Sequence, residues 1–282
     1  MHNLTVSLLN INEAELTINI LNKLARFADE DWAIQVILVD NGSRQEQIQE
    51  LSDWVFENKA HFAEVLFITA SHNLGANGGR NVALKLALYD RILIMDNDLI
   101  LPDDTIWLEK LWQHLEEDPQ VGLVGPMLVF ADLPEVVQGA GIGLTDNGRV
   151  GYLNRAELIS AIPPTSVEVA ASPAACWLIR REAQQQVGLF SEEFYPMQYW
   201  DVDFCVRLVL NGWKIICDRS VKIKHLENVT TRNLKDHPYA RVSVQHWIKF
   251  REKWADVLPQ MATISEEDIY WGPIPRVKAT IE

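Results

Sequence analysis

The sequence has few cysteines and no long run of apolar residues. Its three cysteines, Cys176, Cys205 and Cys217, show neither CxxC spacing nor an even count, which favours reduced, mostly buried thiols over a disulfide framework. No window approaches the roughly 20 apolar residues of a membrane-spanning helix, and the first residues lack the basic and apolar regions of a secretion signal. We therefore expect a cytoplasmic protein without a transmembrane segment, and we leave open peripheral attachment at the inner membrane.

Positive charge is also scarce in this chain. It has 25 Lys and Arg residues against 39 Asp and Glu residues, a net charge of -14. Non-specific binding to nucleic acid or to an anionic membrane surface needs clustered cations, so nucleic acid is not an expected partner. What the chain does have is a hydrophobic content of 48% over 282 residues, which is ample for the core of one or two domains.

The stretch with the clearest chemistry is a short apolar run that ends in two carboxylates. Ile92–Met95 is continuous and apolar, which predicts a buried parallel strand, and Asp96-Asn97-Asp98 follows it directly. Ligands of open α/β sheets bind just beyond the carboxyl ends of such strands. Because two crowded carboxylates repel each other, a hard divalent cation is a natural third partner. At this point an ordinary acidic turn explains the same residues equally well.

Strands and helices alternate through the first hundred residues or so. Apolar runs at 4–9, 34–39, 65–68 and 92–95 predict strands, and apolar residues at helical spacing lie between them. This alternation predicts an α/β fold with a doubly wound, mainly parallel sheet and helices on both faces.

Polar residues at the ends of these strands are expected to meet. Asn10, Asp40-Asn41 and Asp96-Asn97-Asp98 each follow a predicted strand, and neighbouring parallel strands end at one edge of a sheet. A glycine-rich segment at 73–81 opens the next helix, where backbone N–H groups can hold a diphosphate and Arg80 adds a cation. The segment fits neither the GxGxxG fingerprint nor the P-loop. Together these clusters favour a nucleotide-binding first half.

The second half of the chain is less regular. We expect a strand at Val121–Phe130 that Gly125-Pro126 interrupts, and two separate short strands at Ile215–Cys217 and Val221–Lys224. Glycine-rich turns at 139–148 are expected to border a substrate. A long amphipathic helix is predicted over Tyr239–Leu258.

Three residues of this half are candidates for chemistry. Asp201 and Asp203 stand at the start of a predicted helix, where negative charge is favourable and helix capping alone would explain both. His225 follows a predicted strand. A lone histidine is usually structural, but a chain with paired carboxylates needs a further metal ligand, which makes His225 a candidate.

Short motifs follow one another in a recognisable order along the chain. They are Val39-Asp40-Asn41-Gly42-Ser43, Asn73-Leu74-Gly75 with Gly78-Gly79, Asp96-Asn97-Asp98, Asp118-Pro119-Gln120-Val121-Gly122, Leu178-Ile179-Arg180-Arg181-Glu182, Val187-Gly188-Leu189-Phe190, Asp201-Val202-Asp203-Phe204-Cys205 and Gly212-Trp213. Each is modestly specific, and the whole series in order is highly specific. The chain resembles family 2 glycosyltransferases of the GT-A fold, particularly the bacterial rhamnosyltransferase-like group, over about residues 4–230.

The resemblance implies transfer of a sugar from a nucleotide diphosphate donor, a UDP- or dTDP-sugar, with inversion at the anomeric carbon. The acceptor would be a hydroxyl of a glycan or of a lipid-linked or other molecule, in polysaccharide or glycan assembly. Residues 1–230 would form the GT-A domain, with a nucleotide-sugar half at 1–100 and an acceptor and catalytic half at 101–230. Residues 231–282 would be a C-terminal helix and tail packed on that domain, and an oligomer is left open.

The resemblance also assigns roles to residues. Asp40 would contact the donor base or ribose, Asp96 and Asp98 would handle ribose and metal, and His225 would complete the metal site. Asp201 would be the catalytic base. Carboxylate and imidazole ligands fit Mn²⁺ or Mg²⁺. Residues expected to bind the nucleotide sugar are Asn10, Asp40, Asn41, Asn73, Gly75, Gly79, Arg80, Asp96 and Asn97, and those expected on the acceptor side are Tyr199, Trp200 and Asp203.

The chain departs from the family pattern at two places. Trp200 stands where the family has the Glu of a Glu-Asp pair, and the first strand ends in Leu8-Leu9-Asn10 without the usual hydroxyl side chain. Trp200 keeps a non-catalytic sugar-nucleotide-binding protein open as an alternative. A nucleotidyltransferase is a further alternative, but it would carry a basic glycine-rich loop where this chain has Asn10-Ile11-Asn12-Glu13.

Overall fold

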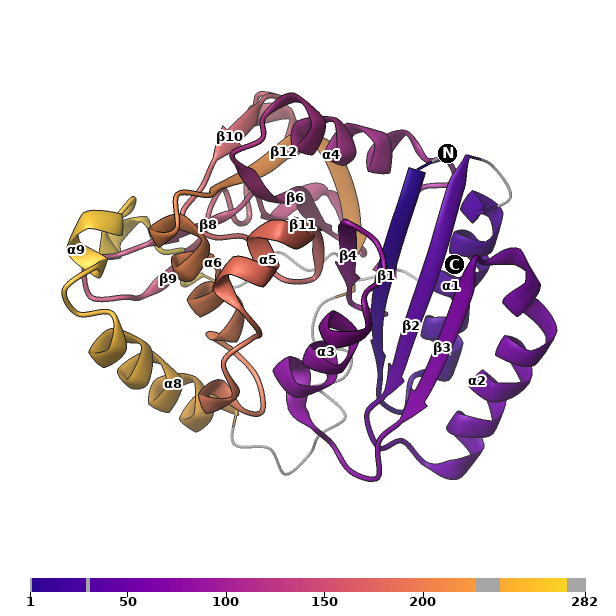
Figure 1. Cartoon of the computed structure of the whole chain (residues 1–282). Coiled ribbons are helices and arrows are strands. Elements are labelled where there is room, and N and C mark those ends of the chain that lie inside the picture. The colour runs from indigo at the N-terminus through magenta and orange to yellow at the C-terminus, as the bar shows by residue number, and fades with distance from the viewer. Residues whose placement is uncertain (1, 29–30, 227–238, 273–282) are drawn as a thin grey trace, which may run out of the picture.

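The computed structural model describes residues 2–28, 31–226 and 239–272, and one large β-sheet runs through them (Figure 1). Its strands are β1 (His2–Asn10), β2 (Trp32–Asp40), β3 (Glu64–Thr69), β4 (Arg91–Met95), β5 (Leu99–Ile100), β6 (Val121–Phe130), β7 (Leu133–Gly139), β10 (Ser166–Glu168), β11 (Cys176–Arg180) and β12 (Lys214–His225). A separate two-stranded sheet consists of β8 (Ile142–Leu144) and β9 (Val150–Tyr152).

Helices flank this sheet and follow it at the C-terminal end of the chain. The α-helices are α1 (Ala14–Ala28), α2 (Gln45–Asn58), α3 (Gly75–Leu86), α4 (Ile106–Glu117), α5 (Arg181–Val187), α6 (Trp200–Leu210), α8 (Tyr239–Lys253) and α9 (Leu258–Met261). Short 3-10 helices are η1 (Lys59–His61), η2 (Ile159–Ala161), η3 (Glu192–Phe194) and η4 (Glu266–Asp268). No helix in these described ranges is long and apolar enough to cross a membrane.

The first half is a parallel sheet covered on both faces, as the alternation predicts. Strands β4, β1, β2 and β3 are neighbours in that order and all run parallel. Val36 and Leu38 of β2 share a buried cluster with Leu24 of α1, whereas Val39 packs with Ala83 of α3. Because successive side chains of a strand point to opposite faces, α1 and α3 lie on opposite sides of the sheet. The α/β, doubly wound prediction is confirmed.

The antiparallel pairs of the sheet involve strands of the second half. Strand β11 lies between β4 and β6 and is antiparallel to both. Strand β12 then runs parallel to β6, and β10 closes that edge as an antiparallel partner of β12. Most strands of the second half therefore extend the sheet of the first half, and only β8 and β9 of the described strands form a small sheet apart (Figure 1).

Two strand predictions in this half are wrong in the same region. Strand β6 is continuous through Gly125-Pro126, and β12 is one strand rather than two short ones. The register of this pair steps from Asp218 opposite Pro126 to Lys222 opposite Met127, so a bulge in β12 lies beside the proline. Proline has no backbone N–H and so cannot donate a hydrogen bond to the neighbouring strand. The bulge leaves residues of β12 unpaired at the place where this hydrogen bond is missing.

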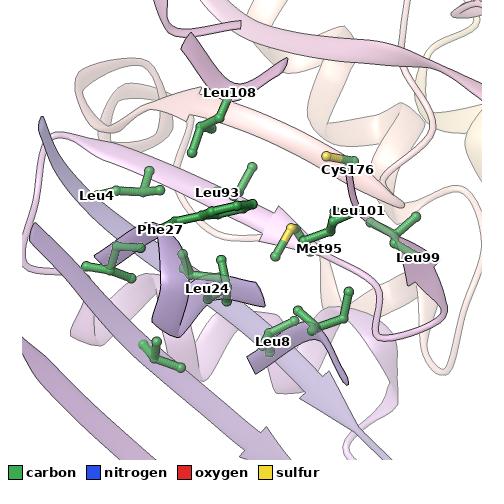
Figure 2. Close-up of a cluster of buried hydrophobic side chains, with 14 of the residues drawn as sticks. Leu4, Leu8, Leu24, Phe27, Leu93, Met95, Leu99, Leu101, Leu108 and Cys176 are labelled. Carbon is green, nitrogen blue, oxygen red and sulfur yellow. The ribbon is translucent and has the colours of Figure 1, made fainter. Parts of the chain in front are cut away.

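A continuous apolar core fills one face of the sheet. Figure 2 shows part of it, with Leu4, Leu8, Leu24, Phe27, Leu93, Met95, Leu99, Leu101, Leu108 and Cys176 labelled. These side chains come from β1, β4, β5 and β11, from α1 and α4, and from Leu101 just after β5. All three cysteines are free and buried, as predicted, and burial raises the pKa of Cys217 to about 12.

The C-terminal helix packs against the second half of the chain. Phe250 of α8 is fully buried, and the ring nitrogens of Trp247 and Trp254 donate to Asn147 O and to the Asp203 carboxylate. The helix predicted over Tyr239–Leu258 ends earlier, at Lys253, and α9 follows. Pro259 lies in the first turn of α9, and a proline inside a continuous helix would remove one hydrogen bond and clash with the preceding turn.

Candidate active site

The carboxyl ends of β1, β2 and β4 meet at one edge of the sheet, and polar side chains follow each of them. Asn10 pairs with Asp40 in the ladder, and the Asn10 amide donates to the Asp40 carboxylate at 2.8 Å. Asn97, just after β4, donates to Thr17 Oγ1 at 2.9 Å, and Thr17 in turn donates to Asn10 Oδ1 at 2.8 Å. A buried hydrogen-bond network therefore links the predicted strand-end residues.

A cavity of about 950 Å³ lies at this edge. The predicted site residues that line it are Asn41, Asn73, Gly75, Arg80, Asp96, Asn97, Asp98, Tyr199, Trp200, Asp201 and His225. Four other predicted residues, Asn10, Asp40, Gly79 and Asp203, are not among the residues that line it. The structure thus brings most of the predicted donor, metal and acceptor residues to one cavity.

Asp96, Asp98 and His225 form a tight cluster in this cavity. Their possible ligand atoms all lie within 4.8 Å of one another, and His225 Nε2 is 3.1 Å from Asp98 Oδ1 and 3.9 Å from Asp96 Oδ2. The pairing of β12 with β5, in which His225 stands opposite Leu99, brings the histidine to the acidic turn. Two carboxylates and one imidazole are a donor set that suits Mn²⁺ or Mg²⁺, so these residues fit a divalent ion.

The electrostatics of Asp96 agree with such an ion. Burial raises the pKa of Asp96 above its ordinary value and the Asp98 carboxylate raises it further, while Arg80 lowers it. Arg80 is itself buried and pairs with Asp96 through a short ion pair. A cation held between the carboxylates would relieve the repulsion that remains.

Trp200 has a clear packing role beside this ion pair. The Arg80 guanidinium lies over the Trp200 ring at 5.1 Å, and Phe190 meets the same ring edge-on at 4.7 Å. An aromatic face is attractive to a guanidinium. Trp200, which the resemblance places at a glutamate position, therefore supports Arg80 and, through it, Asp96.

Asp201 is the second residue of α6 and also lines the cavity. Burial raises its pKa to about 6, against the lowering effect of the backbone N–H groups of Val202 and of Asp201 itself. A carboxylate with a pKa near the working pH can accept a proton far better than an ordinary aspartate. The position and the pKa of Asp201 therefore both suit a general base.

We expected Asp203, two residues after Asp201, on the acceptor side. The structure instead places it inside the protein, away from the cavity. It is fully buried, and its carboxylate accepts from Ser191 Oγ at 2.6 Å, Arg207 Nε at 3.0 Å and Trp254 Nε1 at 3.0 Å. Lys253 Nζ is 2.7 Å from the same carboxylate. Since α6 points this side chain into the protein, Asp203 joins α6 to α8 rather than facing the cavity.

Asp40 and Gly79 are also internal. The Asp40 carboxylate accepts from the backbone N–H of Ser43 at 2.9 Å and from Ser43 Oγ at 2.6 Å, which holds the turn after β2. Asn41 in that turn then accepts from Leu74 N at 2.8 Å. At Gly79 a Cβ would lie 2.3 Å from Leu9 Cδ1, so glycine allows α3 to pack closely on β1.

Part of the cavity wall comes from residues that the sequence did not single out. They include Gln138, Arg149, Tyr152, Trp247, Tyr270 and Trp271. The sequence signal near them was the glycine-rich region expected to form turns at 139–148, which contains the end of β7, strand β8 and the turn before β9. Arg149 stacks on Trp247 at 4.7 Å and pairs with Glu266 at 3.1 Å, which joins β8–β9, α8 and η4 around the cavity. Such long-range contacts leave no local pattern in a sequence.

Comparison with solved structures identifies the fold. GalNAc-T7 with UDP, GalNAc and Mn²⁺ matches 92% of this chain and 49% of its own, with a TM-score of 0.69 at 13% identity. The mannosyltransferase PcManGT of Pyrobaculum calidifontis in complex with GDP-Man and Mn²⁺ matches 89% of this chain and 68% of its own, with a TM-score of 0.57 at 16% identity. S. aureus TarS 1-349 in complex with UDP matches 95% of this chain and 77% of its own, with a TM-score of 0.54 at 16% identity. The fold is GT-A.

Sequence comparison then gives the family. The family model described as Glycosyl transferase family 2 matches residues 6–187, so the chain belongs to that family. The O-antigen biosynthesis protein RfbC of Myxococcus xanthus is 27% identical over 203 residues, which are 70% of this chain and 15% of that protein. The uncharacterized protein y4gI of Sinorhizobium fredii is 23% identical over 235 residues, which are 78% of this chain and 24% of that protein. The chain thus spans a quarter or less of the length of these two relatives.

Proposed function

We propose that this chain is an inverting, metal-dependent glycosyltransferase that moves a sugar from a UDP- or dTDP-sugar to a hydroxyl acceptor. The observation that carries the proposal is that the Asp96, Asp98 and His225 cluster and the Asp201 carboxylate line one cavity at the carboxyl edge of the sheet. The cluster can hold the leaving diphosphate through a divalent ion, and the Asp201 carboxylate can take the acceptor proton.

The donor end of the cavity has the groups that a nucleoside diphosphate needs. Helix α3 begins at Gly75 with its N-terminus at the cavity, where backbone N–H groups and the helix dipole favour phosphate. Arg80, one turn further, adds a buried cation. We assign Asp40 to the nucleoside end as a supporting residue, because it holds the turn to which the cavity residue Asn41 belongs.

Asp96, Asp98 and His225 would hold Mn²⁺ or Mg²⁺. Such an ion supplies Lewis-acid neutralisation of the charge that develops on the leaving diphosphate. The Mn²⁺ named with GalNAc-T7 and PcManGT supports this choice of ion class.

Asp201 would act on the acceptor. The acceptor oxygen forms a bond to the anomeric carbon while the bond from that carbon to the diphosphate oxygen breaks, and the acceptor proton passes to the Asp201 carboxylate. Attack on the face opposite the leaving group inverts the anomeric carbon. One base is enough for this single displacement.

The acceptor side is formed by aromatic residues and Arg149. Tyr199, Trp247 and Trp271 line the cavity there, and flat aromatic rings offer apolar area with little entropy cost. The likeness to a protein of O-antigen biosynthesis supports an acceptor in polysaccharide or glycan assembly. Action at the cytoplasmic side of a membrane would fit such an acceptor.

One observation favours a second candidate, a sugar-nucleotide-binding protein without catalysis. Trp200 replaces the family glutamate and packs on Arg80, so one acceptor-side carboxylate is missing. Product formation from a labelled donor separates the two candidates, because a binding protein would be stabilised by the donor and release no product.

The experiment that tests the proposal is a donor screen. Thermal stability is measured with a panel of nucleotide sugars and Mn²⁺, since a ligand at 100 times its dissociation constant adds about 2.7 kcal/mol to the free energy of unfolding. The donor that stabilises most is then supplied in labelled form with candidate hydroxyl acceptors. Stabilisation by one nucleotide sugar and label transfer from it are expected, and stabilisation by none would contradict the proposal.

A further inference from the structure

Gln138 of β7 makes a contact with the candidate metal site that none of the motifs predicts. The side chain is 2% exposed, and its Oε1 lies 2.8 Å from His225 Nδ1. An amide oxygen can only accept a hydrogen bond, so His225 Nδ1 carries the proton and donates. In the neutral imidazole the other ring nitrogen, Nε2, then carries the lone pair, and it lies 3.1 Å from Asp98 Oδ1.

We propose that Gln138 is a positioning residue that holds His225 in the tautomer and ring orientation needed to ligate a divalent ion through Nε2. The inference rests on the metal site of the proposed function and deepens it. A histidine ligand generally donates its second ring N–H to a fixed acceptor, which orients the ring and raises its basicity. Here the acceptor is a neutral amide from a strand that carries none of the cluster residues.

The backbone of β7 is shaped to aim this side chain. Along the pair of β6 and β7, Gly139 stands opposite Leu128 and Val137 stands opposite Val129, so Gln138 is an extra residue without a partner of its own. A bulge of this kind turns a side chain away from its regular direction and occurs often beside active sites. Arg155 donates to the Gln138 carbonyl at 3.1 Å and so satisfies the backbone at the bulge.

Packing alone does not explain an amide at this position. Among the described residues, Gln138 Nε2 is buried without a hydrogen-bond partner. A buried donor without a partner is unfavourable, and a leucine or methionine of similar size would avoid that cost. The oxygen of the same amide, in contrast, has a defined partner in His225. The acceptor atom is therefore the part of Gln138 that the site uses.

The test compares Mn²⁺ affinity in two variants that differ in the acceptor. Titration of Mn²⁺ by electron paramagnetic resonance is carried out on the full chain with UDP, dTDP or GDP, whichever stabilises the wild type. Gln138→Leu removes the acceptor, and Mn²⁺ affinity should fall about 10–100-fold. Gln138→Glu keeps an acceptor at the same place and should stay within a few-fold of the wild type. The thermal stability of Gln138→Leu without metal should be unchanged or higher.

Two controls separate positioning from general damage. Gln184 is another buried glutamine, which lies on α5 and donates to Gly188 O, so Gln184→Leu should leave Mn²⁺ affinity unchanged. In a His225→Ala background, Gln138→Leu should cause no further loss, because its effect passes through the histidine.

The outcomes are distinguishable. Wild-type Mn²⁺ affinity in Gln138→Leu, or a full additional loss in the His225→Ala background, would overturn the role of Gln138 and leave the proposed function standing. Absence of Mn²⁺ binding by the wild type with all three nucleotides would overturn the metal part of the proposed function, and this inference with it.

Discussion

At the scale of single residues, Asp201 and Asp203 show how two carboxylates two positions apart take different environments. One turn of α6 places Asp201 at the cavity and Asp203 in a buried network with Arg207 and Trp254. Position on a helix, rather than residue type, decides which of the two faces the cavity.

Asp201→Asn should lower turnover by about 10²–10⁴-fold, the usual contribution of a general base. Asparagine keeps the size and the hydrogen bonding of the side chain but cannot take the proton. Donor affinity should change little, since the base acts on the acceptor. The measurement is label transfer at saturating donor with parallel calorimetry of donor binding. Near-normal turnover in this variant, with complete loss in Asp203→Asn, would mean that the base is the other carboxylate.

The raised pKa of Asp201 predicts a pH dependence of activity. Its pKa of about 6 means that kcat/KM should fall about tenfold per pH unit below pH 6, because the base is then protonated. The effect of pH on the free energy of unfolding is opposite to the effect that a salt-bridged aspartate would cause. A folded pKa above the ordinary 3.8 means that the native state binds the proton more tightly, so the free energy of unfolding falls as pH rises from about 4 to about 6.

Because asparagine does not ionise, Asp201→Asn should not lose stability as pH rises from about 4 to about 6. Above pH 6 this variant should therefore unfold at a higher urea concentration than the wild type. Below pH 4 the two proteins should unfold together. A wild-type kcat/KM profile that stays flat down to pH 4.5 would contradict the assignment of a raised pKa to the catalytic base.

Asp40→Ala should weaken binding of the nucleoside diphosphate while Mn²⁺ still binds to the complex that forms. The Asp40 carboxylate holds Asn10 and both the backbone and side chain of Ser43, and this turn carries the cavity residue Asn41. Calorimetry with UDP or dTDP measures the effect. Asp53→Ala is a control, because Asp53 is exposed on α2 and accepts a hydrogen bond from Gln49 of its own helix. Wild-type nucleotide affinity in Asp40→Ala would remove Asp40 from the donor site.

At the scale of elements, the most informative contact is the one between α6 and α8. Asp203 of α6 meets Lys253 of α8 and Trp254 just beyond it, so the helix that presents Asp201 is fixed by a helix that follows a long stretch later in the chain. The C-terminal helix therefore supports the helix that places Asp201 at the cavity.

Asp203→Asn should reduce the free energy of unfolding by about 3 kcal/mol, because it removes the fully buried carboxylate that pairs with the partly buried Arg207 guanidinium. Urea unfolding at pH 7 measures the change, and Asp201→Asn provides an internal contrast because it should move in the opposite direction. Unfolding of Asp203→Asn at the wild-type midpoint would show that the network adds nothing to stability.

At the scale of the whole molecule, the parallel half was predictable from sequence and the rest of the cavity was not. Ile92–Met95 is apolar throughout and ends in Asp96, and such local patterns specify both a buried strand and its functional end. The insertion of β11 between β4 and β6 rests on antiparallel pairing of residues far apart in sequence. No local pattern encodes that pairing, and the same holds for the bulge in β7 that aims Gln138.

The resemblance to a family added expected roles to candidates that the sequence had already suggested. His225 alone has no distinctive neighbours, yet the pairing of β12 with β5 carries it to Asp98. Asp203, in contrast, matched a motif and was expected on the acceptor side, but it is buried and does not line the cavity. A motif fixes which residues belong together, whereas packing decides which of them face a ligand.

The measurement that tests the central claim most directly is nucleotide binding with and without a divalent ion. Calorimetry with UDP and dTDP is carried out in Mn²⁺ and in EDTA, on the wild type and on Asp98→Asn. The Asp96, Asp98 and His225 cluster predicts binding of one nucleotide in Mn²⁺ that weakens at least about tenfold in EDTA and in Asp98→Asn, as expected when an ion joins the diphosphate to the protein. Equal affinity under all of these conditions would contradict a metal-assisted nucleotide-sugar site.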